Sequence, residues 1–352
     1  MAKVPLLERF SCPINFEKPS PVTPTPHFLQ LYQANDEAIR AELVAGLLAD
    51  PPRVSPKFFY DALGSRLFDA ITELAEYYPT RTEAAIFAAH HSAMSKQLPP
   101  GAVLIDLGAG NCAKAASLFP WLAPKAYLAV DISVHYLHQT MGQLQQRYPS
   151  MPMLGLGMDF SNQLTLPPGA TEWLQRYDLG NAPRCVFYPG SSIGNFDPDH
   201  ALTLLRQARD VCAAGGPGGG LLIGVDRVKD RALLEPAYDD ALGVTAAFNR
   251  NLLLHINALL GSDFAPARWR HVAFYNAAAA RIEMHLAAQG EQLVRWPDNQ
   301  CCFADGARLH TERSYKWTCN GFSDLLSDAG FGAVQHWSDE RGWFSVFWAL
   351  AG

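Results

Sequence analysis

Apolar residues gather in short runs through the central part of the chain, and helix-like stretches separate the early runs. A continuous apolar run of a few residues, bounded by turn residues, is typical of a strand buried on both faces. Strands that alternate with helices predict an α/β fold, in which helices cover both faces of a mostly parallel sheet. The expected strands span residues 103–107, 127–131, 153–158, 184–188 and 221–226.

The flanks of this alternation follow other patterns. Residues 1–30 are rich in proline, and we expect an extended arm that is ordered only where it packs on the body. The spacing of Thr80 and Glu83 is that of a capping box, which predicts a helix starting there. After the fifth strand the pattern predicts a helix pair within residues 231–300, and an extended segment at 271–287. A last helix and an antiparallel hairpin should complete the sheet, at residues 322–329, 333–338 and 343–350.

Composition limits the classes of function. The chain of 352 residues is 49% hydrophobic and carries a net charge of −6, so it is globular and lacks the basic surplus of a nucleic-acid-binding surface. No apolar run has the length of a membrane span, and no signal-peptide core is seen near the start. The seven cysteines include no Cys-x-x-Cys pair. We therefore expect a cytoplasmic protein without disulfides.

The first predicted strand ends in a motif that suits a nucleoside-bearing cofactor. Asp106 is followed by Gly108 and Gly110, and glycines allow the backbone to turn tightly beside a ligand. Asp131 ends the next strand 25 positions later, near the spacing expected of a carboxylate that binds ribose hydroxyls. The dinucleotide fingerprint requires a third glycine where Ala113 stands. An acid before the glycines also suits a cationic ligand, so S-adenosylmethionine is favoured over NAD.

A second motif allows a different enzyme class. Gly190, Ser192 and Gly194 match the Gly-x-Ser-x-Gly elbow of serine hydrolases. An elbow requires a helix that begins at the serine, whereas Asp197 and Pro198 predict that the next helix begins later. We therefore keep the hydrolase as a less favoured alternative.

His310 and Glu312 form a third motif, similar to the His-x-Glu of zinc deaminases. The Pro-Cys-x-x-Cys segment that completes such a zinc site is missing, and the other histidines are scattered along the chain. No metal site is expected here.

Several longer segments carry a resemblance to a known family. They are Phe59-Tyr60-Asp61, Glu76-Tyr77-Tyr78-Pro79-Thr80-Arg81, Pro189-Gly190-Ser191-Ser192-Ile193-Gly194-Asn195, Ala237-Tyr238-Asp239-Asp240, Gly243 to Asn251, Arg281-Ile282-Glu283-Met284, and Glu312-x-Ser314. In this order they resemble the histidine Nα-methyltransferases of ergothioneine biosynthesis, over nearly everything after the proline-rich arm. Ser192 stands where the family leads us to expect threonine, and both residues carry a hydroxyl.

The resemblance implies a set of site residues. Asn195 and Tyr238 would hold the substrate carboxylate, and Glu312 with Ser314 would hold the imidazole. Tyr60 and Asn195 would lie at the reacting centre. The full substrate set is Tyr60, Tyr77, Gly190, Asn195, Tyr238, Met284, Glu312 and Ser314. The cofactor set, from the glycine motif and the resemblance together, is Asp106, Gly108, Gly110, Lys114, Asp131, Asp159 and Phe160.

The resemblance also implies the architecture and the reaction. A class I methyltransferase domain would comprise residues 91–227 and 316–352, and an α+β substrate domain would comprise 31–90 and 228–315. The expected reaction is S-adenosylmethionine-dependent trimethylation of the α-amine of free L-histidine to hercynine, without an obligate protein partner. A relative that methylates an indole amino acid is the nearer alternative. Such an enzyme would lack an acid facing the side chain, which Glu312 supplies.

Overall fold

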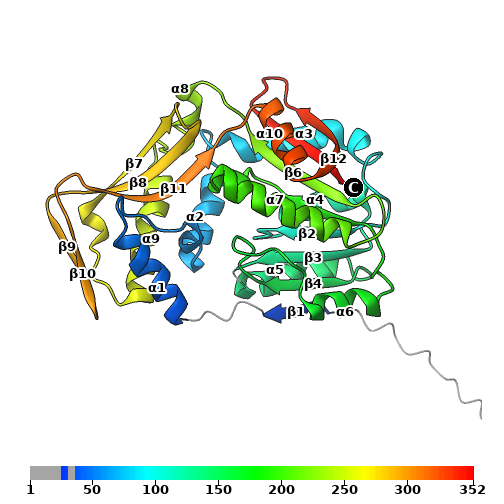
Figure 1. The fold of residues 1–352 in the computed structure, drawn as a ribbon, viewed down its shortest axis with the longest axis horizontal. Coiled ribbons are helices and arrows are strands. Elements are labelled where there is room, and N and C mark those ends of the chain that lie inside the picture. The colour runs from blue at the N-terminus through cyan, green and yellow to red at the C-terminus, as the bar shows by residue number, and fades with distance from the viewer. Residues whose placement is uncertain (1–24, 31–35, 133) are drawn as a thin grey trace, which may run out of the picture.

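The computed structural model describes residues 25–30, 36–132 and 134–352 (Figure 1). Most of the predicted proline-rich arm, residues 1–24, therefore lies outside the described residues. Residues His27–Gln30 at the end of this arm form strand β1, which pairs in parallel with β4 (Met153–Gly157) at the edge of the sheet. The ring of Phe28 lies over Gly155. A Cβ atom at Gly155 would come within 2.5 Å of this ring, so β1 can pack here because residue 155 is glycine.

A mixed sheet of eight strands forms the centre of the part of the chain that the structure describes. All of its pairs are parallel except those made by β13, which runs antiparallel to both neighbours. The predicted strands, the mostly parallel sheet and the final antiparallel hairpin are confirmed. Its order is β1, β4, β3 (Ala126–Asp131), β2 (Val103–Leu107), β5 (Arg184–Tyr188), β6 (Gly220–Asp226), β13 (Phe344–Ala351) and β12 (Phe331–Ser338).

Helices cover both faces of this sheet because its strands bury side chains on both sides. One core contains alternate residues of β2, such as Val103 and Ile105, with the helices α6 (Pro168–Arg176), α7 (Pro198–Ala213) and α10 (Cys319–Asp328). The opposite core contains Leu104, and its helices are α3 (Tyr78–Met94), α4 (Ala113–Leu122) and α5 (Val134–Arg147).

A separate hydrophobic core joins the N-terminal region to the segment between β6 and β13. It is built on a three-stranded antiparallel sheet in the order β11, β8, β7, beside a two-stranded hairpin (Figure 1). Trp269 and Phe59 are among its fully buried side chains. Its elements are α1 (Asp36–Leu47), η1 (Pro56–Phe59), α2 (Ala62–Thr72), α9 (Val244–Leu260), η3 (Pro266–Arg268), β7 (Trp269–Asn276), β8 (Arg281–Ala288), β9 (Gln292–Trp296), β10 (Asn299–Phe303) and β11 (Arg308–Tyr315).

The predicted helix pair in residues 231–300 is wrong. The first helix, α8 (Arg231–Leu234), has only four residues, and one long helix, α9, follows after the left-handed Gly243. Pro236 ends α8 early because proline cannot donate a helical hydrogen bond. The extended segment expected at 271–287 is two strands, β7 and β8, separated by a turn.

The predicted capping box at Thr80 is also wrong. Helix α3 begins two residues earlier, at Tyr78, with Pro79 in its first turn. Proline is favoured in the first turn because its fixed φ suits the helix and its missing N–H would be unsatisfied there. Glu83 therefore does not cap this helix, and its carboxylate instead binds Lys114 and the backbone N–H of Gly190.

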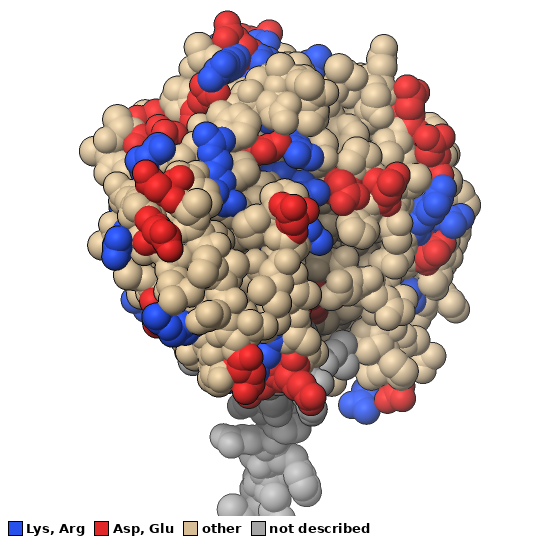
Figure 2. Space-filling view, turned by 60° about the vertical axis from the view of Figure 1, so that its left-hand side comes forward, with Lys and Arg blue, Asp and Glu red and all other residues tan. Residues whose placement is uncertain are grey.

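Charged groups are mixed on the face of the molecule drawn in Figure 2, where Lys and Arg alternate with Asp and Glu. Among the described residues, no helix has the length and apolar character needed to cross a bilayer. The six cysteines within the described ranges are all free thiols.

Candidate active site

The glycine motif lies where the ends of two parallel strands meet. Gly108 and Gly110 follow β2 with φ of 68° and 51°, in the left-handed region that favours glycine. The backbone N–H of Gly110 donates to Asp131 Oδ2 at 2.9 Å, across to the end of β3. This contact places the Asp131 carboxylate at the glycine turn, as the sequence spacing predicts.

A cavity of about 270 Å³ opens in front of this turn. Gly108, Gly110, Asp131, Asp159 and Phe160 line it, which brings together five of the seven residues predicted for the cofactor. The Phe160 ring meets Tyr188 edge to face at 5.8 Å between centroids. The cavity thus combines an aromatic wall, a carboxylate and a backbone turn without side chains, which suits an adenosine group.

Lys57 is a residue of this cavity that the sequence did not single out. It lies in η1, and its Nζ donates to Asp159 Oδ2 at 3.0 Å. Asn162 donates to the same oxygen, and the Ser161 backbone N–H donates to the other one. An amino group of a ligand would therefore share Asp159 with these donors.

The other two predicted cofactor residues, Asp106 and Lys114, do not line the cavity. Asp106 is 2% exposed and accepts a hydrogen bond from the Tyr127 hydroxyl at 2.7 Å. Burial raises the pKa of Asp106 to about 7, although this hydrogen bond lowers it. Lys114 forms an ion pair with Glu83 at 2.7 Å. Asp106 thus joins β2 to β3, and Lys114 joins α4 to α3, instead of facing the cavity.

A second cavity, of about 50 Å³, adjoins the first. The two share Tyr60, Phe68, Ser192 and Asn195. All eight residues predicted for the substrate line it: Tyr60, Tyr77, Gly190, Asn195, Tyr238, Met284, Glu312 and Ser314.

Gly190 is held in the wall of this cavity by a residue distant in sequence. Its backbone N–H donates to Glu83 Oε1 at 2.8 Å, and the other Glu83 oxygen binds Lys114. Glu83 is 1% exposed and lies in α3. Helix α3 therefore fixes the loop after β5, which carries Asn195.

One irregularity in the small sheet decides which side chains face the cavity. The β8–β11 register shifts between His310 and Glu312, so that Thr311 is an extra residue. Glu312 consequently pairs with Met284 and faces the cavity, whereas His310 pairs with His285 on the opposite face. The His-x-Glu motif is thus divided between the two faces of the sheet.

The cavity wall around Glu312 combines apolar side chains such as Phe248 and Met284 with hydroxyl groups and the Asn195 amide. Burial raises the pKa of Glu312 to about 7, and Lys316 opposes the rise. Burial raises the pKa values of Tyr60, Tyr77 and Tyr238, and the nearby Glu312 carboxylate raises them further. The tyrosines are therefore neutral phenols at physiological pH, and Glu312 is the acid that titrates in this cavity.

Behind the cavity lies a buried ionic cluster that sequence reasoning missed. Asp226 is fully buried at the end of β6, with Lys316 at 2.8 Å and Lys229 at 2.5 Å. The Tyr78 hydroxyl donates to the same carboxylate at 2.8 Å. Burial would raise the pKa of Asp226, but the two lysines more than offset this and lower it.

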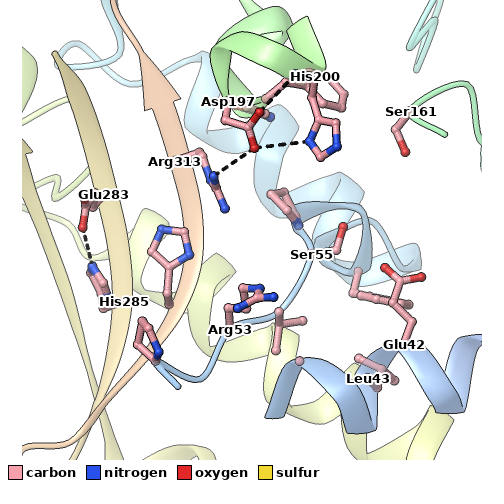
Figure 3. Close-up of a pocket in the computed structure, with 18 of the residues that line it drawn as sticks. Glu42, Leu43, Arg53, Ser55, Ser161, Asp197, His200, Glu283, His285 and Arg313 are labelled. Atoms are coloured by element: carbon pink, nitrogen blue, oxygen red, sulfur yellow. Dashed lines mark hydrogen bonds and ion pairs between the residues drawn. The ribbon is translucent and has the colours of Figure 1, made fainter. Parts of the chain in front are cut away.

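The outer face of the small sheet borders a third cavity, of about 950 Å³ (Figure 3). Glu283, His285 and His310 lie together there, with their ligand atoms within 4.8 Å of one another. Glu283 Oε1 already accepts from Arg281 at 2.7 Å, and Arg308 and Arg313 line the same cavity. Three guanidinium groups oppose a divalent cation by Coulomb repulsion, so we interpret the cluster as an ion-pair network of the wall.

The loop after β5 does not have the geometry of a hydrolase elbow. Ser191 has a φ of 59°, whereas Ser192 begins a single turn of 3₁₀ helix, η2 (Ser192–Asn195). The Ser192 hydroxyl donates to the carbonyl of Pro189 at 3.3 Å. Helix α7 begins only at Pro198, with Asp197 as its N-cap, as predicted.

Comparison with known proteins gives one family over almost the whole chain. The model of the family described as "Histidine-specific methyltransferase, SAM-dependent" matches residues 39–351. A histidine N-alpha-methyltransferase of Mycolicibacterium smegmatis is 37% identical over 89% of this chain and 95% of its own length. A histidine N-alpha-methyltransferase of Mycobacterium tuberculosis is 36% identical over 88% of this chain and 94% of its own length. Ergothioneine biosynthesis protein 1 of Neurospora crassa is 32% identical over 82% of this chain. The matched region covers 32% of that longer protein.

Proposed function

Since this chain belongs to the histidine-specific, S-adenosylmethionine-dependent methyltransferase family, we propose that it methylates the α-amine of free L-histidine. One observation carries the proposal beyond family membership. The cofactor cavity and the substrate cavity adjoin, and a partly buried carboxylate, Glu312, lies in the wall of the second. A ligand in the first cavity can therefore reach an amino acid whose side chain contacts Glu312.

The first cavity fits S-adenosylmethionine, which supplies an electrophilic methyl group on a sulfonium. Asp131 lies at the glycine turn, where it can accept from ribose hydroxyls. Phe160 offers an aromatic surface for the adenine. Gly108 and Gly110 leave room for the rest of the cofactor, because neither has a side chain.

The second cavity fits histidine from both ends. Asn195 and Tyr238 carry donors that suit the substrate carboxylate, and Glu312 and Ser314 suit the imidazole. Held at these two ends, the α-amine lies toward Tyr60 and Asn195, which both cavities share. Methyl transfer requires a neutral amine about 3–3.5 Å from the methyl carbon, so positioning is the main contribution of the protein.

We further propose that the reaction proceeds to the trimethylated betaine hercynine, as the first step of ergothioneine biosynthesis. Each methyl group removes one N–H from the amine, so an enzyme that held the amine by several hydrogen bonds would stop early. A site that holds the carboxylate and the imidazole leaves the amine free to rotate between transfers. The cytoplasmic location expected from the cysteine content stays a prediction.

An indole amino acid is the second candidate substrate. Its ring is largely apolar, and placing it against the partly buried Glu312 carboxylate would leave that acid poorly solvated. Glu312 therefore favours histidine.

Mass spectrometry of the product formed from S-adenosylmethionine and an equimolar mixture of free amino acids tests the proposal. We expect histidine alone to be consumed, with three added methyl groups at completion. Methylation of tryptophan in preference to histidine would overturn the substrate assignment. A product that remains monomethylated with excess cofactor would overturn the proposed extent of methylation only.

A further inference from the structure

Lys316 is completely enclosed behind the substrate cavity, directly after β11. Its side chain has 0% exposure. Its Nζ donates to the Tyr238 hydroxyl at 2.9 Å and to Ser314 Oγ at 2.8 Å, and it forms an ion pair with Asp226 Oδ2 at 2.8 Å. An ammonium group has three hydrogens, and here each has its own acceptor.

We propose that Lys316 is a positioning residue that directs one hydroxyl hydrogen of the Ser314–Tyr238 pair toward the substrate, and that the imidazole end of the site therefore selects the neutral ring. This inference rests on the proposed function, because the ring concerned is that of histidine.

Counting the hydrogens of the Ser314 and Tyr238 hydroxyls supports a donor directed toward the substrate. Both oxygens accept from Lys316, and they lie 2.9 Å from each other. Together they carry two hydrogens, and their mutual contact can use only one. At least one hydrogen is therefore directed away from Lys316, toward the cavity that both residues line. A hydroxyl that accepts from an ammonium group is also a stronger donor, because hydrogen bonds in a chain polarise one another.

Glu312 supplies the complementary acceptor in the same cavity. A neutral imidazole has one N–H and one nitrogen lone pair. The N–H matches the Glu312 carboxylate, and the lone pair matches the hydrogen that the Ser314–Tyr238 pair directs into the cavity. An imidazolium has two N–H groups and no lone pair, so it would leave that hydroxyl hydrogen without an acceptor.

A second lysine on the same carboxylate provides a matched control. Lys229 also forms an ion pair with Asp226, and it donates to the Tyr78 hydroxyl at 2.8 Å and to the Arg227 carbonyl at 2.7 Å. It does not line the substrate cavity. Lys316→Met and Lys229→Met therefore remove equal charge from one buried acid, but only the first removes a donor to Ser314 and Tyr238.

The test compares steady-state kinetics of Lys316→Met, Lys229→Met, Ser314→Ala and the double variant Lys316→Met/Ser314→Ala. Loss of a charged hydrogen bond predicts that Lys316→Met raises the KM for histidine by about 10–100-fold, with the KM for S-adenosylmethionine unchanged. Ser314→Ala should cause a similar loss. The double variant should lose little more than either single variant, because both changes remove one interaction. Lys229→Met should change the histidine KM by less than about threefold, because Lys229 does not line the substrate cavity.

Equal losses in Lys316→Met and Lys229→Met, or fully additive losses in the double variant, would overturn the inference. Calorimetric binding of S-adenosylhomocysteine establishes that each variant is folded. If Lys316→Met fails this check, the same comparison is made with Asp226→Asn added to both lysine variants, which leaves no unpaired buried acid. Failure of the proposed function is distinguishable, because the wild-type protein would then not methylate histidine at all.

Discussion

Glu312 lies directly opposite Met284 in the β8–β11 ladder, because the extra residue Thr311 shifts the register just before it. Without that shift, the alternation of a strand would place Glu312 on the same face as His310, away from the substrate cavity. Thr311 is fully buried, and its hydroxyl donates to the carbonyl of Met284 at 3.0 Å. The bulge is thus fixed by a hydrogen bond to the residue that Glu312 faces.

Removing that hydrogen bond should disturb the site through the backbone. We expect Thr311→Ala to lower the free energy of unfolding by about 1–3 kcal/mol, because the Met284 carbonyl loses a buried partner. The KM for histidine should rise, while the affinity for S-adenosylhomocysteine stays the same. Denaturant unfolding and steady-state kinetics measure the two effects. Thr311→Ser keeps the hydroxyl and serves as the control, and an equal rise in KM in both variants would show that the hydrogen bond is irrelevant.

The pH dependence of histidine use should contain a step that belongs to Glu312. A pKa raised to about 7 means that the carboxylate forms above this pH and is protonated below it. Acceptance of an imidazole N–H is therefore gained as the pH rises through about 7, and it is lost as the pH falls. Lys316 is the facing cation, and Tyr60, Tyr77 and Tyr238 stay neutral across this range.

Profiles of kcat/KM for histidine against pH, measured for the wild type and Glu312→Gln, separate this step from the titration of the substrate. Both proteins should show the rise above pH 8 that follows deprotonation of the amine. The glutamine variant should lack the step near pH 7. Identical profiles would assign that step to the substrate alone.

Asp131 should account for a large part of cofactor affinity. Asp131→Ala removes a charged acceptor for the ribose hydroxyls, and we expect S-adenosylhomocysteine to bind about 10–150-fold more weakly. Because Asp131 also accepts from Gly110 N, Asp131→Asn is the control that keeps an oxygen beside the glycine turn. Calorimetry gives both affinities. Unchanged binding in the alanine variant would mean that the cofactor site lies elsewhere.

Glu83 should be needed for stability as well as for the substrate loop. Glu83→Ala leaves the partly buried N–H of Gly190 without its acceptor, which costs about 1–3 kcal/mol in the free energy of unfolding. Glu83→Gln keeps an oxygen at this position, so it should retain most of the stability and lose only the ion pair with Lys114. Urea unfolding measures the free energy of unfolding of both variants. An alanine variant as stable as the wild type would show that this contact has no role.

The central sheet could be predicted from the sequence because its strands are continuous apolar runs. Val103, Leu104 and Ile105, for example, are each at most 1% exposed, and a strand buried on both faces has no polar positions to obscure its limits. The elements of the small domain were less predictable. Pro236 and Gly243 interrupt a segment with helical periodicity, and sequence periodicity alone did not show that α8 would stop after one turn.

The site was predicted mainly from the resemblance, and its supporting residues were missed for a physical reason. The direction of a side chain depends on packing between distant segments, as with Asp106, which turns toward Tyr127 below the glycine loop. Lys316 lies 90 residues after Asp226, and an isolated lysine gave no signal that it would be buried. The sequence likewise showed no sign of the bulge at Thr311, although Glu312 and Ser314 are two residues apart, as side chains on one face of a strand are, and both line the cavity.

The most direct test of the account is the ratio of kcat/KM for histidine to that for tryptophan in the wild type, Glu312→Gln and Glu312→Ala. If Glu312 accepts the imidazole N–H, Glu312→Gln should lower kcat/KM for histidine by about 10–150-fold and leave binding of S-adenosylhomocysteine intact. Glu312→Ala should also open space beside Met284 and raise the relative use of tryptophan. Equal losses on both substrates in both variants would contradict the account, because Glu312 would then support the structure without recognising histidine.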